Sequence, residues 1–415
     1  MRRWLSLAIA ANLLLATAAL ARLDGDHPRG QALRMHGTPD LSVDTTLPDP
    51  DLPWTTAPTI TTPASVPKTH STVSRVTVTV PAPVNTAAWA AVPPYAVDKL
   101  GLWLIDADHQ NGRLLVGDLA PTSVGFSADG KQAAVSAFDD PPYNGAKPIR
   151  LYVVDVASGN RRQIAPGATA PGGPVWSPDG QWIAFGAQPD HNQPIADDPS
   201  APSGPHGVSE IWVVRPSGDD LHRVAVVDGF GGRLTWSPKG HVLTASLYND
   251  NRVLVADVDA ATEHRWPFTQ PYLVDWSPKG DQLVVSSDKA PTQLMNPTTG
   301  AVTPLALDAW FPRWSPTQDV IAVRSNGFAG VIPATGGVFR PFGQGSPLDW
   351  SSDGRSLDYE NTSWNVQVAD ASTATSRTIA SVDSGSGMSL SPTVWVPGTR
   401  LVAMIAEPNA GAYAP

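Results

Sequence analysis

Short apolar segments and polar turns alternate along residues 96–407. Each repeat of this pattern has an apolar segment ending in an aromatic residue, a turn related to Ser-Pro-Asp-Gly, and a second apolar segment such as Trp182–Phe185. Proline presets the backbone angle early in such a turn and glycine accepts a positive angle late in it, so each copy predicts a β-hairpin. The aromatic residues that end the first segments are Phe126, Trp176, Trp236, Trp276, Trp314, Trp350 and Trp395.

These aromatic residues are about 45 residues apart on average, which is the length of a four-stranded propeller blade. A second pattern, an apolar strand followed by a polar turn, also occurs seven times, and its first copy at Leu102–Ile105 precedes Phe126. The chain therefore begins with the outer hairpin of a blade and ends, at 395–406, with the inner hairpin of one. We predict an all-β propeller of seven four-stranded blades in which N- and C-terminal strands complete one blade, with six blades as the alternative. The aromatic residues are expected between neighbouring sheets.

The first 94 residues have a different composition. Arg2 and Arg3 precede the apolar run 4–20, and a small-residue site ends at Ala21, so residues 1–21 are predicted to be a signal peptide or an uncleaved N-terminal anchor. Residues 22–94 contain 12 Pro and 13 Thr and predict a disordered tether. The propeller is assigned to residues 95–410. We therefore expect an extracytoplasmic protein that is periplasmic, displayed on the cell surface or secreted.

Composition narrows the function further. The net charge of −10 has the wrong sign for neutralising phosphates, so nucleic acid is a poor partner. The absence of cysteine removes disulfides and thiolate metal sites, and the nine histidines form no metal-binding pair in the sequence. We predict no metal and no cofactor, membrane contact only through an uncleaved N-terminal segment, and a monomer.

The copies Trp176-Ser177-Pro178-Asp179-Gly180 and Trp350-Ser351-Ser352-Asp353-Gly354, together with segments such as Leu102–Asp108, resemble the TolB-type, WD-like propeller repeat. The resemblance covers roughly residues 96–407 and implies the propeller fold. It implies little about function, because the same repeat builds TolB proteins, the propellers of prolyl-oligopeptidase-like peptidases and many other secreted proteins. TolB also carries an α/β domain before six blades, and this sequence predicts seven blades after a tether.

Candidate binding residues lie in segments expected on one face of the ring, where the loops between second and third strands meet the loops between blades. Two of the loops between second and third strands are long, at 138–144 and 188–209. Each could be a solvated loop, a ligand or cation site, or a protein contact. Four aromatic residues between blades, which are either core residues or an exposed binding patch, are Phe230, Tyr272, Trp310 and Phe311. The polar candidates are Asp139, Asp140, Tyr143, Asp190, His191, Asp197, Asp198 and His206.

Two other patterns are expected to be structural. The segment Asp106–Gly112 resembles a calcium loop but lacks the downstream Glu that would complete one, so we expect a tight turn between two strands. The serine that follows each aromatic residue recurs in the turns and is expected to shape them. No catalytic set emerges from the sequence.

The favoured function is non-catalytic binding of a protein or peptide of the cell envelope. Two alternatives stay open: a lyase or hydrolase acting on a polysaccharide or small ester at the channel mouth, and a glycan-binding module associated with the wall. The sequence therefore does not settle whether the protein is an enzyme, and it favours a protein that is not.

Overall fold

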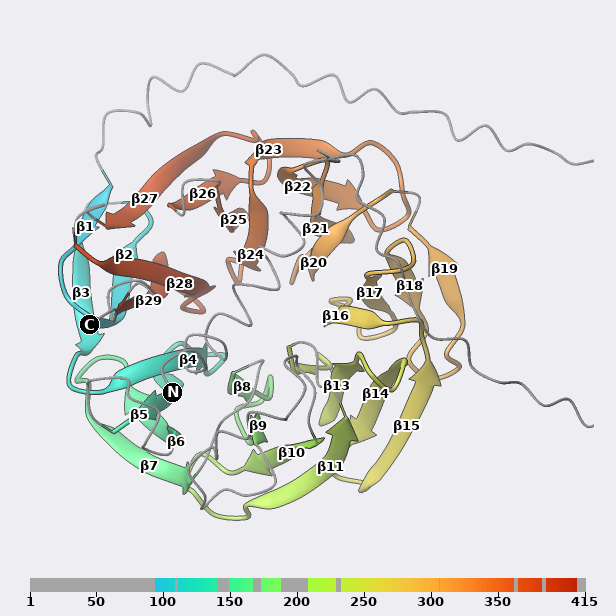
Figure 1. The fold of residues 1–415 in the computed structure, drawn as a ribbon, viewed down its shortest axis with the longest axis horizontal. Helices are drawn as coiled ribbons and strands as arrows, with labels where there is room; N and C mark the ends of the chain where they lie inside the picture. Colours follow the sequence, from blue (N-terminus) through green and yellow to red (C-terminus); the bar gives the residue numbers. More distant parts are fainter. Residues whose placement is uncertain are drawn as a thin grey trace, which may run out of the picture. The chain divides into compact units, whose positions relative to one another are not determined.

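The computed structural model in Figure 1 describes residues 94–408 with short gaps and shows seven β-sheets arranged as the blades of a ring. All of its described elements are strands, numbered β1 to β29, and none of the described segments is a helix that could cross a membrane. The predicted signal segment and tether, residues 1–93, lie outside the described residues. The described ranges are 94–108, 111–139, 149–166, 173–187, 208–228, 233–305, 307–361, 365–382 and 386–408.

Each blade is an antiparallel meander whose first strand lies nearest the centre of the ring (Figure 1). Blade 1 contains β4 (Ala120–Phe126), β5 (Gln132–Phe138), β6 (Ile149–Asp155) and β7 (Arg161–Pro166). Blade 2 contains β8 (Val175–Trp176), β9 (Ile183–Ala187), β10 (Val208–Val214) and β11 (His222–Asp228). Blade 3 contains β12 (Thr235–Trp236), β13 (Val242–Leu247), β14 (Arg252–Asp257) and β15 (Thr262–Pro267).

The next three blades repeat this order. Blade 4 contains β16 (Pro271–Trp276), β17 (Leu283–Ser287), β18 (Gln293–Met295) and β19 (Val302–Pro304). Blade 5 contains β20 (Trp310–Trp314), β21 (Val320–Ser325), β22 (Phe328–Pro333) and β23 (Arg340–Gln344). Blade 6 contains β24 (Ser346–Trp350), β25 (Ser356–Glu360), β26 (Val366–Asp370) and β27 (Ser376–Val382).

The seventh blade joins the two ends of the propeller. It combines β28 (Met388–Trp395) and β29 (Leu401–Pro408) with β2 (Gly101–Asp106) and β3 (Gly112–Val116). Leu102 pairs with Ile405, and Asp106 pairs with Leu401, across the antiparallel β2–β29 junction. The predicted seven blades and the predicted closure are both confirmed, and the six-blade alternative is wrong.

One strand has no counterpart in the repeat. The strand β1 (Tyr95–Val97) pairs in parallel with β27, so blade 6 has five strands. Val97 is buried in the apolar core that blades 6 and 7 share, and the Tyr95 ring lies 5.7 Å from that of Trp103. The chain therefore enters the propeller along the outer edge of the blade that precedes the closing blade.

The recurring turn explains why its sequence is repeated. In blade 2, Ser177 Oγ accepts a hydrogen bond from the backbone N–H of Trp182 at 2.9 Å and donates one to Asp179 at 2.7 Å. Gly180 has φ +73°, in the left-handed region, and its N–H donates to the Ser177 carbonyl at 2.9 Å. Serine, aspartate and glycine therefore each have a separate task in closing the hairpin.

The aromatic residue before each turn packs against the neighbouring blade. All seven have an exposed fraction of 9% or less. In three blades the indole Nε1 donates a hydrogen bond to the preceding blade. The acceptor is the backbone carbonyl of the residue just before that blade's own aromatic residue. These bonds run from Trp176 to Gly125 at 3.1 Å, from Trp236 to Val175 at 3.0 Å and from Trp350 to Arg313 at 3.0 Å. The side chains thus join consecutive blades by area and by hydrogen bonding.

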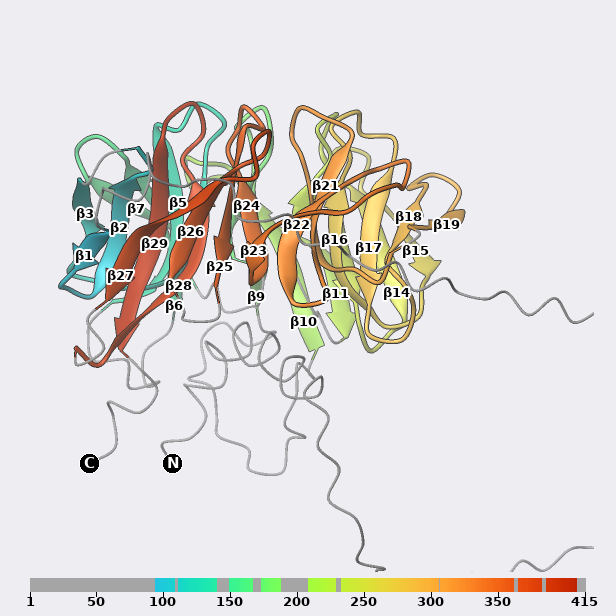
Figure 2. The same cartoon turned by 90° about the horizontal axis from the view of Figure 1, so that it is seen from above.

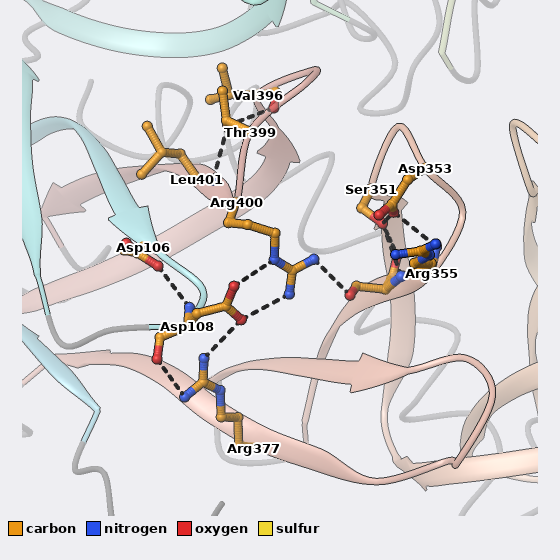
Figure 3. Close-up of polar contacts among 11 residues, drawn as sticks. Asp106, Asp108, Ser351, Asp353, Arg355, Arg377, Val396, Thr399, Arg400 and Leu401 are labelled. Carbon is orange, nitrogen blue, oxygen red and sulfur yellow. Dashed lines mark hydrogen bonds and ion pairs between the residues drawn. The ribbon is translucent and has the colours of Figure 1, made fainter.

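Three charged residues reinforce the closing blade (Figure 3). Arg400, in the turn between β28 and β29, donates through Nε and Nη2 to the two carboxylate oxygens of Asp108 at 2.8 and 3.0 Å. Arg377 of blade 6 lies 3.5 Å from the same carboxylate. The Asp106 N–H donates to the Asn111 carbonyl at 2.9 Å, as in a tight turn. The segment that resembles a calcium loop therefore directs its Asp108 carboxylate to two arginines.

Candidate functional site

Two faces of the ring can be distinguished. The loop face carries the connections between the second and third strands and between blades, and the turn face carries the Ser-Pro-x-Gly turns. Figure 2 shows the propeller edge-on, with the two faces above and below the strands. The inner strands begin at the loop face and end in their aromatic residues toward the turn face. Two groups of charged side chains lie along these inner strands.

The first group occupies one register position of the ring. In every blade the residue before the aromatic residue pairs with a residue of the second strand, and these pairs are small or apolar in blades 1, 2, 3 and 7. In blades 4 to 6 they contain charges. The seven pairs are Gly125–Ala134, Val175–Ala184, Thr235–Thr244, Asp275–Val284, Arg313–Ala322, Asp349–Asp358 and Val394–Ala403. We call Asp275, Arg313, Asp349 and Asp358, together with Arg233, the inner charge cluster.

Arg313 is central to this cluster. Its Nε donates to the Leu348 carbonyl at 2.9 Å and its Nη1 to the Pro312 carbonyl at 3.0 Å, so it links blade 5 to blade 6. Burial lowers the pKa of Arg313 to about 10, and the neighbouring positive charge of Arg233 acts in the same direction. The carboxylates of Asp275 and Asp349 oppose this shift. The cluster therefore alternates positive and negative side chains over successive blades.

The carboxylates of the cluster are bound by groups of neighbouring blades. Asp275 accepts the backbone N–H of Trp276 at 3.0 Å and that of Trp314, in blade 5, at 2.8 Å, and burial raises its pKa. Asp358 is fully buried, and the equivalent residue in four other blades is alanine. It accepts the Trp395 indole N–H at 3.0 Å, the Asp349 N–H at 2.9 Å and the Thr393 hydroxyl.

Burial and the nearby Asp349 raise the pKa of Asp358 to about 7. The Asp358 carboxyl therefore exchanges its proton near neutral pH while enclosed by hydrogen-bond donors from blades 6 and 7. This arrangement connects blades 4 to 7 around the centre of the ring. The chemistry that this arrangement allows is proton exchange at a carboxyl that contacts both blade 6 and blade 7.

The second group lies where the inner strands begin, at the loop face. Trp310 and Phe311 open β20, and both are half-buried. A β-bulge falls between Trp310 and Arg313, and Phe311 has φ +53°, in the left-handed region that bulky residues rarely adopt. The Phe311 ring meets Tyr272 of blade 4 edge-on at 6.1 Å. Tyr272 itself is a buried core residue, and burial raises the pKa of its hydroxyl.

Three ionisable side chains accompany these aromatic residues. Arg324 lies directly opposite Trp310 across the β20–β21 pair, and the corresponding pair in blade 6 is Ser346–Glu360. Glu407 lies one residue before the end of β29 in blade 7. Arg324 retains 8% and Glu407 6% of its exposed area, and burial raises the pKa of Glu360 and of Glu407 to about 7. We call Trp310, Phe311, Arg324, Glu360 and Glu407 the loop-face group.

Among the polar candidates from the sequence, Asp139 lies within the described part of the chain. Its carboxylate is 2.5 Å from Arg150 Nε and accepts a hydrogen bond from the Tyr152 hydroxyl. Burial and the Asp139 charge raise the pKa of Tyr152 to about 12. Asp139 therefore closes the base of the first long loop. Candidates outside the described residues are Asp140, Tyr143, Asp190, His191, Asp197, Asp198, His206 and Phe230.

The structure thus brings together Trp310 and Phe311 from the sequence candidates and adds charged neighbours that the sequence reasoning missed. A signal for the inner charge cluster was present: aligned on their aromatic residues, the repeats place charges before Trp276, Trp314 and Trp350. A signal for Arg324 was also present, because it interrupts the apolar strand 320–323. Within the described residues, no three histidine or carboxylate side chains are grouped to hold a metal ion.

Comparison with known proteins adds the following findings. No protein-family model matches the chain. An uncharacterised protein of Agrobacterium fabrum is 25% identical over 206 residues, which are 45% of this chain and 61% of that protein. Similar solved structures include the β-propeller domain of Cps50 (Swd1) from Myceliophteria thermophila, with 11% identity over 68% of this chain and 96% of that one, and a TM-score of 0.49.

A putative TolB from Agrobacterium tumefaciens is also similar, with 17% identity over 75% of this chain and 99% of that one, and a TM-score of 0.43. The class of this protein, a seven-bladed β-propeller, follows from its own strand order and closure.

Proposed function

We propose that this protein is an extracytoplasmic propeller that binds a protein or peptide of the cell envelope at its loop face, without catalysis. The observation that carries the proposal is the strained placement of Phe311 beside Trp310. A bulky residue held in the left-handed region costs conformational energy, and such strain concentrates at binding sites. Here it places two half-buried aromatic residues at the start of one inner strand, on a closed and rigid ring.

The N-terminal sequence supports the location. Arg2 and Arg3 followed by the apolar run 4–20 are typical of an export signal, and the Pro- and Thr-rich segment 22–94 would separate the propeller from a membrane if the signal stayed uncleaved. The net charge of −10 disfavours nucleic acid as a partner. We propose a monomer, since the ring of seven sheets closes within one chain.

A cross-linking capture from envelope extract tests the binding role, with the full chain as bait. Trp310→Ala and Phe311→Ala remove the aromatic rings of the site. Val338→Ala is the matched control, because Val338 is 81% exposed in the same blade, beside the turn that follows β22. The proposal expects one envelope protein that the wild type and Val338→Ala enrich and that both aromatic variants lose. Equal enrichment by all four baits, or no enrichment by any, contradicts it.

A second candidate function has one observation in its favour. Glu360 and Glu407 have pKa values of about 7, a range in which a carboxyl can act as a general acid. This favours a lyase or hydrolase acting on a polysaccharide or small ester. Glu360→Gln and Glu407→Gln would then abolish turnover of such a substrate and leave partner capture unchanged. A glycan enriched in place of a protein would instead favour the glycan-binding module.

A further inference from the structure

We infer that Arg324 is an anchoring residue for the carboxylate of an acidic peptide segment bound at the loop face. This inference rests on the proposed function and adds the chemistry of the partner. It predicts a partner segment that carries an acidic side chain or a free chain end at this point.

Arg324 is a buried cation without a counter-charge in the described part of the chain. It retains 8% of its exposed area, its side chain makes no hydrogen bond or ion pair with another described residue, and burial is the one cause that lowers its pKa. Buried guanidinium groups are normally paired, since leaving one unpaired is strongly unfavourable. Other arginines of the propeller form ion pairs with aspartates: Arg161 with Asp118, Arg150 with Asp139 and Arg400 with Asp108.

The side chain is directed to the gap between blades 5 and 6 at the loop face. Ala322, two residues earlier on β21, packs with Trp350 and Leu357 of blade 6, and residues two apart in a strand share a face. Arg324 therefore faces blade 6. Of its three guanidinium nitrogens, only Nε is both enclosed and unpaired. The Nη groups thus remain available to a ligand, in the forked geometry that fits a carboxylate.

The surroundings also favour a peptide carboxylate. Trp310, directly across the strand pair from Arg324, offers a large half-buried ring to neighbouring peptide groups. Glu360 lies at the matching position one blade further on, and its raised pKa leaves its carboxyl partly neutral at pH 7. A partly neutral carboxyl repels an incoming carboxylate less than an ionised one does. An acidic segment can therefore approach this part of an otherwise negatively charged protein.

Binding of defined peptides to the full chain tests the inference. The probe is a fluorescently labelled pentaglutamate, with pentaglutamine and pentalysine as comparisons, titrated by anisotropy at about 0.15 M salt. We expect pentaglutamate to bind more tightly than either comparison. Arg324→Gln should weaken that binding about tenfold or more, and Arg324→Lys should weaken it less, because lysine keeps the charge but loses the fork.

The matched control is Arg252→Gln, which removes the same charge from an exposed position where β14 begins, after a connection on the loop face of blade 3. It should change the affinity for pentaglutamate less than twofold. Arg324→Gln should melt no lower than the wild type, since it removes an unpaired buried charge, so lost binding would not reflect unfolding. Equal affinity of Arg324→Gln and wild type, or no preference for pentaglutamate, overturns the inference.

The capture experiment separates this inference from the proposed function. If the envelope partner is lost with Trp310→Ala but retained by Arg324→Gln, the binding function stands and the acidic anchor is wrong. If pentaglutamate binds through Arg324 and no envelope protein is captured, the anion site stands and the scaffold function is wrong. Loss of the partner in both variants supports both.

Discussion

Arg400 holds Asp108 in a two-point ion pair across the closing blade, with Nε–Oδ2 and Nη2–Oδ1 distances of 2.8 and 3.0 Å. The two residues are at opposite ends of the propeller sequence, and Arg400 also donates to Ser356 of blade 6 at 3.0 Å (Figure 3). The pair therefore ties the N-terminal strands, the C-terminal strands and the neighbouring blade at one point. Closure depends on this contact in addition to the β2–β29 backbone ladder.

Replacing Asp108 by asparagine should lower the free energy of unfolding by about 1 kcal/mol. The two side chains are 40% and 37% exposed, so solvent reduces the Coulomb energy, but the loss also leaves two arginines close together. Urea unfolding measures the change. Asp118→Asn is the control: it removes an equally bidentate pair with Arg161, but from a carboxylate that is 68% exposed. An equal effect of both variants would contradict a special role in closure.

The fold was predictable because the turn has strict local requirements. Gly180 has φ +73°, and the Ser177 hydroxyl makes two hydrogen bonds within the turn. Few other residues meet these two requirements, so the turn sequence recurs and its spacing gives the number of blades. The offset between Leu102–Ile105 and Phe126 predicted the shared closing blade. Strand β1 escaped prediction, because three residues, Tyr95–Val97, carry no periodicity and their pairing with β27 is a tertiary contact.

The candidate site was predictable only in part. Trp310 and Phe311 were found because aromatic residues between blades stand out in the sequence. Asp275, Arg313 and Asp358 escaped notice, since a charge beside a strand usually means a solvent-facing position, and only the ring geometry buries it. The role of the long loop 188–209 stays a prediction for most of its length, because residues 188–207 lie outside the described ranges.

Asp358→Asn should stabilise the propeller more at pH 8 than at pH 5. Burial and Asp349 raise the pKa of Asp358 from 3.8 to about 7, so the folded state disfavours the ionised form. For a carboxyl whose pKa is raised on folding, stability falls as pH rises from the unfolded to the folded pKa. Asparagine mimics the neutral carboxyl, since its oxygen can accept from Trp395 and its amide can donate to Thr393.

The expected difference between the two pH values is on the order of 1–3 kcal/mol, measured by urea unfolding of both proteins. Asp358→Ala provides the comparison, because alanine occupies the equivalent position in four other blades. That variant should destabilise at both pH values, since it leaves the Trp395 indole N–H without its acceptor. A stability difference between Asp358→Asn and wild type that does not change with pH would contradict the assignment.

The tryptophans that end the inner strands should differ in how much their indole N–H groups contribute to the free energy of unfolding. Trp350 Nε1 donates to the Arg313 carbonyl at 3.0 Å, whereas Trp276 Nε1 is buried without an acceptor among the described residues. The two side chains are 6% and 7% exposed, so phenylalanine removes a similar area from each. Trp350→Phe should therefore cost about 1 kcal/mol more than Trp276→Phe in thermal or urea unfolding. Equal costs would mean that the hydrogen bond between blades contributes nothing measurable.

His241 should make the stability of the turn face fall as pH rises above neutral, whereas acid unfolding occurs as pH falls. Its Nε2 lies 2.8 Å from Asp179 of blade 2 and its Nδ1 lies 2.7 Å from Asp259 of blade 3, so the imidazolium bridges two blades. Burial lowers the pKa of His241, but the hydrogen bonds to the two carboxylates outweigh burial and raise it above 6.5. Burial opposes the hydrogen bonds at Asp179 as well, yet its pKa falls to about 2.

Because the pKa of His241 is raised on folding, its contribution is complete below pH 6.5 and is lost as pH rises through the folded value. The wild type should therefore lose stability relative to His241→Gln as pH rises above about 6.5, by about 1 kcal/mol. His264→Gln is the control, because His264 stacks on Trp266 at 5.6 Å and forms no ion pair with another described residue. Parallel pH profiles for the wild type and His241→Gln would show that the bridge between the blades does not depend on the imidazolium charge.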